Sequence, residues 1–151
     1  MKEKKYLKMT NKDSFVRWQN IRITQLGFAN NLLIALGVTL IGFTLDFIQT
    51  DQLILNLTQK FLFWVGISLG ILSIGLGLFV VINRLEDFKL TAQITRKREN
   101  EKTSGIKEDR TQTKILGKRT WCCFIWQVVT FSVGFLLLLI MILIELIDKI
   151  G

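Results

Sequence analysis

The sequence has no histidine and no proline, and its two cysteines, Cys122 and Cys123, are adjacent. The absence of histidine removes the commonest general base, the commonest metal ligand and the Ser-His and Cys-His nucleophile systems. Two adjacent cysteines cannot build a disulfide framework, and no phosphate-binding loop, dinucleotide-binding fingerprint or paired cysteine motif occurs. We therefore predict that the protein is not an enzyme and has no catalytic residues, no metal ligands and no cofactor.

Charged residues are absent from three long stretches, although they make up 21% of the chain. The stretches are residues 23–45, 61–83 and 120–144, of 23, 23 and 25 residues. Each exceeds the roughly 20 residues that cross about 30 Å of hydrocarbon at about 1.5 Å per residue. A soluble protein of 151 residues could not surround three helices that are apolar on every face. We predict three transmembrane helices over these ranges, with Asp46 and Glu145 as boundary residues at the ends of the first and the third.

The basic residues are divided unequally among the segments that connect these helices. Residues 1–22 contain seven Lys and Arg and residues 84–119 contain eleven, whereas residues 46–60 and 145–151 contain one each. Lys and Arg close to the ends of membrane helices mark the cytoplasmic side. We therefore place the N-terminal segment and residues 84–119 inside. The N-terminal segment could form an interfacial helix or a cytoplasmic extension of the first span. The loop 46–60 and the tail 145–151 lie outside in this prediction.

The cytoplasmic segment 84–119 is predicted to be largely helical. No proline ends the second helix at the membrane surface, and apolar residues recur beyond it at helical spacing, namely Leu85, Phe88 and Ala92. The clearest break is at Thr103-Ser104-Gly105, where Gly105 suits a left-handed helix cap. The predicted fold is thus all-α, with three transmembrane helices and a long cytoplasmic helical hairpin between the second and the third. The alternative is a solvated charged loop.

The start of this segment mixes charges of both signs with apolar residues at the level of the lipid headgroups. Arg84 could pair with Asp87 or stack on Phe88, and we name these three residues the collar. Two roles stay open for the collar: helix packing with a stop to membrane insertion, or contact with a partner or gating. The run from Arg84 to Ala92 resembles an Arg-Leu-x-Asp-Phe-[Arg/Lys]-x-Thr-Ala run that follows a hydrophobic span in uncharacterised small bacterial multi-span membrane proteins. The resemblance covers about ten residues and implies no chemistry.

Small residues form a regular stripe on each of the first two spans. Membrane helices associate through such residues, because burial of apolar surface gains nothing against lipid. On the second span the stripe is Gly66, Gly70, Ser73 and Gly77. On the first span it is Asn31, Ala35, Thr39 and Gly42. We predict close helix contacts along these stripes, within one chain or between chains.

Three amide side chains lie at similar depth in the spans: Asn30 and Asn31 in the first and Gln127 in the third. An amide without a partner in hydrocarbon costs several kcal/mol. We therefore predict a hydrogen bond between Asn30 or Asn31 and Gln127. This polar layer could serve helix packing, or it could line a pore in an oligomer.

The function predicted from these features is that of a non-enzymatic helical protein of the bacterial inner (cytoplasmic) membrane, with the N-terminus inside and the C-terminus outside. It is expected to form a homo-oligomer and to present the basic segment 84–119, the basic arm, to a cytoplasmic protein partner. Its inner face would attract the anionic headgroups of membrane lipids. The inside-positive topology accounts for the net charge of +8, so nucleic acid is not an expected partner. The alternative function is an oligomeric pore, a channel or a membrane-disrupting effector of a bacterial conflict (defence) system.

Overall fold

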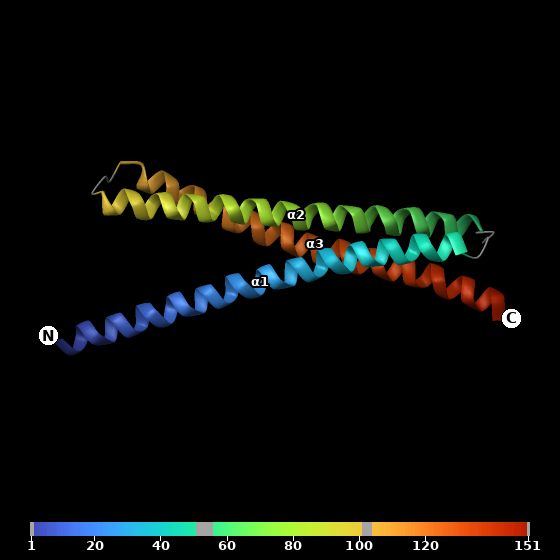
Figure 1. The fold of residues 1–151 in the computed structure, drawn as a ribbon, viewed down its shortest axis with the longest axis horizontal. Coiled ribbons are helices and arrows are strands. Elements are labelled where there is room, and N and C mark those ends of the chain that lie inside the picture. The colour runs from blue at the N-terminus through green and yellow to red at the C-terminus, as the bar shows by residue number, and fades with distance from the viewer. Residues whose placement is uncertain (1, 51–55, 101–103, 151) are drawn as a thin grey trace.

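A computed structural model describes residues 2–50, 56–100 and 104–150, and within these ranges it places the side chains of residues 17–18, 20–49, 56–100 and 104–147. The described chain consists of three long helices (Figure 1): α1 (Lys2–Thr50), α2 (Leu57–Glu99) and α3 (Ile106–Ile150). All three contain a segment that is long and apolar enough to span a membrane. The all-helical prediction with three such helices is therefore confirmed.

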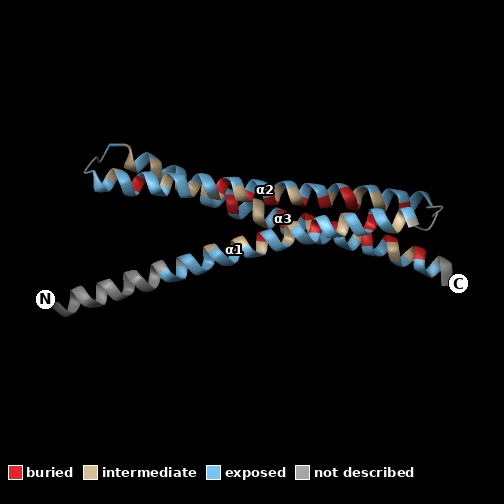
Figure 2. Cartoon of the chain, in the orientation of Figure 1, coloured by how far each residue is buried: buried red, intermediate tan, exposed pale blue. Residues whose placement is uncertain are grey.

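The first helix is longer than its apolar stretch. Residues 2–50 form one continuous helix, so the basic segment 1–22 extends α1 from Lys2 and does not form a separate helix. Toward its N-terminus α1 runs away from the other two helices, as Figure 1 shows. In Figure 2 the buried residues of α1 gather in its C-terminal half, where it lies against the other helices. The bundle therefore has three helices over only part of its length.

Helices α2 and α3 form a long antiparallel pair (Figure 1). Helix α2 continues past Arg84 without a break, as the lack of proline predicted, and ends at Glu99. Its end is earlier than the predicted break at residues 103–105, of which residue 103 lies outside the described residues. Gly105 has a positive φ of 81°, as predicted, and directly precedes α3. Its carbonyl oxygen accepts a hydrogen bond from the Asp109 amide at 3.1 Å.

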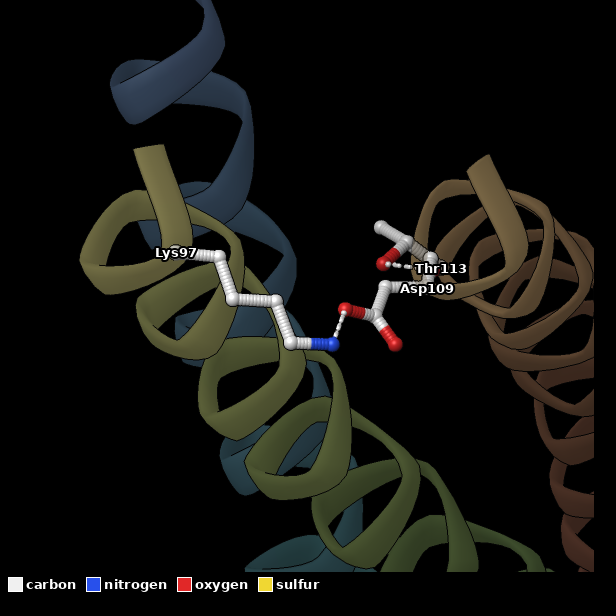
Figure 3. A network of polar contacts seen from close by, with 3 residues as sticks. All are labelled: Lys97, Asp109 and Thr113. Atoms are coloured by element: carbon white, nitrogen blue, oxygen red, sulfur yellow. Dashed lines mark hydrogen bonds and ion pairs between the residues drawn. The ribbon is translucent and has the colours of Figure 1, made fainter. Parts of the chain in front are cut away.

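A polar contact joins the two helices near this turn. Lys97 Nζ of α2 lies 2.6 Å from Asp109 Oδ2 of α3, and the Thr113 hydroxyl donates to the Asp109 carbonyl oxygen at 3.1 Å (Figure 3). The Lys97 side chain is 36% exposed, so its ion pair is screened by water and contributes at most about 1 kcal/mol. The ion pair therefore joins the two helices but adds little to their stability.

The small residues of α2 lie at the centre of the bundle. Gly66, Gly70, Ser73 and Gly77 are all buried, which agrees with the predicted contact stripe. Against them lies Gly134 of α3: a Cβ atom added at position 134 would be 3.1 Å from the Gly66 carbonyl oxygen and 3.4 Å from the Gly70 amide nitrogen. The two backbones therefore approach each other closely at this crossing. Gly134 was not among the residues predicted from the sequence.

The contact between α1 and α2 is made by large residues on small ones. A Cβ atom at Gly77 would lie 2.8 Å from the Ile34 side chain, and one at Gly70 would lie 3.3 Å from the Ile41 side chain. In the reverse direction, a Cβ atom at Gly37 of α1 would lie 3.2 Å from the Ile74 side chain. Each glycine thus accommodates an isoleucine of the neighbouring helix.

The predicted stripe of α1 is not part of this contact. Asn31, Ala35, Thr39 and Gly42 are exposed, and a Cβ atom at Gly42 would have no other group within 4 Å. The prediction of a contact within the chain through this stripe is therefore wrong. The physical reason is that Gly70 and Gly77 of α2 pack against Ile41 and Ile34, which lie on a different face of α1. A contact between chains through the stripe stays a prediction.

Candidate functional site

All three helices contribute to one polar layer inside the bundle, centred on Gly77 of α2. Asn30 of α1 is 1% exposed, and its Nδ2 donates to the Gly77 carbonyl oxygen at 3.3 Å. Gln127 of α3 is 0% exposed, and its Nε2 would lie 2.5 Å from a Cβ atom at Gly77. The Ser73 hydroxyl donates to the Gln127 carbonyl oxygen at 3.0 Å. The missing side chain at position 77 makes room for the Gln127 amide and for the Ile34 side chain.

The predicted hydrogen bond between Asn30 and Gln127 is not formed. Within the described part of the chain, Asn30 Oδ1 and both amide atoms of Gln127 have no hydrogen-bond partner. Asn31 is exposed and takes no part in the layer, because consecutive helical residues point in directions about 100° apart. The sequence therefore indicated the depth of the layer and two of its members, but not their partners. The amide and hydroxyl side chains of the layer can donate and accept hydrogen bonds but carry no charge.

A second polar contact lies near the connection between α1 and α2. Gln59 Nε2 of α2 donates to Glu145 Oε2 of α3 at 3.0 Å. The backbone N–H of Asn56 donates to Gln59 Oε1 at 2.7 Å. Gln59 and Glu145 are both buried. The sequence predicted Glu145 only as a boundary residue and did not indicate its hydrogen bond to another helix. The spacing from Gly134 through Leu138 and Met141 to Glu145 follows one helix face and could have indicated it.

The collar joins α2 to α1 through Arg84. Its Nη2 donates to the Ile23 carbonyl oxygen of α1 at 2.6 Å, and a Cβ atom at Gly27 would lie 2.9 Å from Nη1. The guanidinium carbon lies 5.9 Å from the centre of the Phe88 ring, so the predicted stacking is observed. A long arginine side chain therefore connects the two helices at a position where α1 has no side chain in its way.

The predicted ion pair between Asp87 and Arg84 is not formed. Within the described residues no ion pair joins the Asp87 carboxyl to Arg84, and its Oδ1 has no hydrogen-bond partner. Burial raises the pKa of the Asp87 carboxyl above its ordinary value, and the positive charge of Arg84 lowers it in part. The nearby Asn83 is also buried, with no partner for Nδ2 in the described chain. The collar is thus a contact between helices in which Asp87 Oδ1 has no hydrogen-bond partner among the described residues.

We compared the chain with known proteins at three levels. No family model, no curated protein and no solved structure matches it.

The remaining candidate features are surfaces. In the described residues no group of three or more Cys, Asp or Glu side chains could hold a metal ion. The basic arm, made of α2 from residue 84 and α3 up to residue 119, has an open groove of about 500 Å³ between its helices. The groove is lined by charged, amide and apolar side chains of both helices, among them Glu86, Lys89, Gln93, Gln112, Ile115 and Arg119. The exposed stripe of α1 is the second surface.

Proposed function

We propose that the protein is a non-enzymatic, three-span protein of the bacterial cytoplasmic membrane that forms oligomers through α1 and presents its basic arm to a cytoplasmic protein. The main support for the oligomer is that the amide side chain of Asn31 is exposed in the apolar part of α1. An amide that faces hydrocarbon gains strongly from a hydrogen-bonding partner. A second copy of the chain would supply that partner.

The surroundings of Asn31 favour a close approach of a second helix. Ala35 and Gly42 share its face of α1, and Gly42 has open space around it. Small residues in such an arrangement let helix backbones approach closely in a membrane. The Thr39 hydroxyl at the edge of the stripe donates to the Ala35 carbonyl oxygen at 2.9 Å, so it adds no unpaired donor to the contact.

The charge distribution supports the orientation and the role of the arm. Residues 84–119 hold eleven Lys and Arg and six Asp and Glu, and the arm extends beyond the apolar part of α2 and α3. Segments so rich in Lys and Arg stay in the cytoplasm. The groove between the two helices, with carboxylate, ammonium, amide and apolar groups, suits a protein partner that supplies both charges and apolar side chains.

Substitution of Asn31 by leucine tests the oligomer. We expect the dissociation constant of the oligomer to rise about 3- to 30-fold, since one hydrogen bond between membrane helices contributes about 0.6 to 2 kcal/mol. The measurement is Förster transfer between labelled full-length chains, diluted in lipid vesicles. Ser132→Leu is the matched control, because Ser132 is an exposed polar residue of α3 away from the stripe. A monomeric wild-type protein, or equal effects of both variants, would refute the proposal.

A pore is the second candidate function. Because Asn31 and Thr39 are exposed, we propose that these two residues would line it, and not the buried polar layer. Asn30 and Gln127 are enclosed by the helices of a single chain and cannot face a lumen between chains. If the oligomer conducts, proteoliposomes should show an ion flux that Asn31→Leu abolishes while the protein still inserts. Oligomers that leave the vesicles impermeable would exclude this candidate.

A further inference from the structure

An open cleft of about 540 Å³ lies between α1 and α3. Toward its N-terminus α1 separates from the other two helices (Figure 1). Most of its lining is apolar: Ile23, Leu26 and Ala29 of α1, and Trp121 and Phe124 of α3. Two polar residues of α1, Arg22 and Gln25, complete the lining. The cleft therefore combines apolar walls with a cationic group.

The cleft crosses the boundary between the charged and the apolar part of α1. Arg22 is the last charged residue before the stretch 23–45, and Ala29 lies about 10 Å further along the helix axis at about 1.5 Å per residue. In the proposed topology, Arg22 is thus at the headgroups of the inner leaflet and Ala29 is among the acyl chains. Trp121 lies on the facing helix, where a tryptophan ring suits the interface.

The charged residues of α1 at the level of the cleft are positive. The described part of α1 from residue 17 to residue 30 contains Arg17 and Arg22 and no acidic residue. Ile23 lines the cleft, and its carbonyl oxygen accepts a hydrogen bond from the guanidinium of Arg84. The Arg22 side chain is exposed, so a ligand in the cleft can reach its guanidinium.

We propose that this cleft binds one anionic phospholipid of the inner leaflet. The Arg22 guanidinium donates to the phosphate oxygens, a geometry in which arginine forms paired hydrogen bonds. One acyl chain packs against Leu26, Ala29 and Phe124. Basic pockets between membrane helices on the cytoplasmic side are suited to anionic headgroups. The inference rests on the proposed membrane topology but not on the oligomer.

Native mass spectrometry of the full-length protein tests this site, with phosphatidylglycerol or phosphatidylcholine added to the detergent. We expect one tightly held phosphatidylglycerol per chain and weaker retention of phosphatidylcholine. Arg22→Gln should weaken the phosphatidylglycerol adduct about fivefold. Arg17→Gln is the control, because Arg17 lies on the same helix and outside the cleft. An excess of soluble glycerol phosphate should not displace the lipid, since it offers no acyl chain.

The outcomes separate this site from the oligomer. Equal retention of the two lipids, equal effects of the two arginine variants, or displacement by glycerol phosphate would overturn the lipid site. Ala29→Phe, which fills the apolar part of the cleft, should reduce retention of both lipids, and unchanged retention would also overturn it. The same spectra report the number of chains, so a monomer that keeps its Arg22-dependent lipid would refute only the proposed oligomer.

Discussion

Replacement of Gly134 by valine is expected to lower the free energy of unfolding by about 2 to 3 kcal/mol, the cost of forcing extra carbon atoms into a filled helix contact. The new Cβ atom would lie 3.1 Å from the Gly66 carbonyl oxygen and 3.2 Å from Leu69 Cβ. The carbonyl oxygen belongs to the backbone of α2 and cannot rotate away, so the two helices must move apart. Thermal unfolding in detergent, followed by circular dichroism at 222 nm (a standard helix band), measures the change.

Gly117→Val is the matched control for this prediction. Gly117 lies in the same helix, and a Cβ atom there would have no other group within 4 Å. Because glycine disfavours a helix interior more than valine does, this variant should keep or slightly raise the stability. Equal losses for the two variants would show that the contact between Gly66 and Gly134 does not hold α2 and α3 together.

Replacement of Gln59 by leucine is expected to cost about 1.5 to 3 kcal/mol, the contribution of a hydrogen bond to a carboxyl group. The change removes the Nε2 donor that lies 3.0 Å from Glu145 Oε2, and the carboxyl group is left buried without it. Unfolding by denaturant in detergent, with the helix signal as the readout, gives the free energy of each variant.

A double-mutant cycle distinguishes a specific pair from two independent effects. With Glu145 replaced by methionine as well, both polar partners are gone, and the double variant should recover to within about 1 kcal/mol of the wild type. Additive losses in Gln59→Leu, Glu145→Met and the double variant would contradict the pairing.

The helices of this protein follow from simple sequence features. The three charge-free stretches predict three apolar helices, and the absence of proline predicts that α2 continues beyond Arg84. The regular small residues of α2 predict its contact face, because a spacing of three and four residues keeps them on one side of a helix. Each of these features is local, so the sequence contains it directly.

The partners across the helices could not be predicted in the same way. Asn30 and Asn31 are chemically identical neighbours, and only the packing of α1 on Gly77 decides that the first is buried and the second exposed. Arg84 stacks on Phe88 of its own helix, as predicted, but its bond to the Ile23 carbonyl oxygen of α1 was not indicated by the sequence. Such contacts depend on the rotation and crossing of whole helices, which no local pattern determines.

The proposed cytoplasmic orientation of the basic arm is tested most directly by cysteine labelling. In a chain whose native cysteines are replaced by alanine, single cysteines are introduced by Ser104→Cys beside the arm's turn and by Thr58→Cys at the start of α2, since both positions are exposed. Bacterial spheroplasts are treated with a membrane-impermeant maleimide. We predict immediate labelling at position 58, and labelling at position 104 only after the membrane is permeabilised. Labelling of position 104 in intact spheroplasts would contradict a cytoplasmic arm.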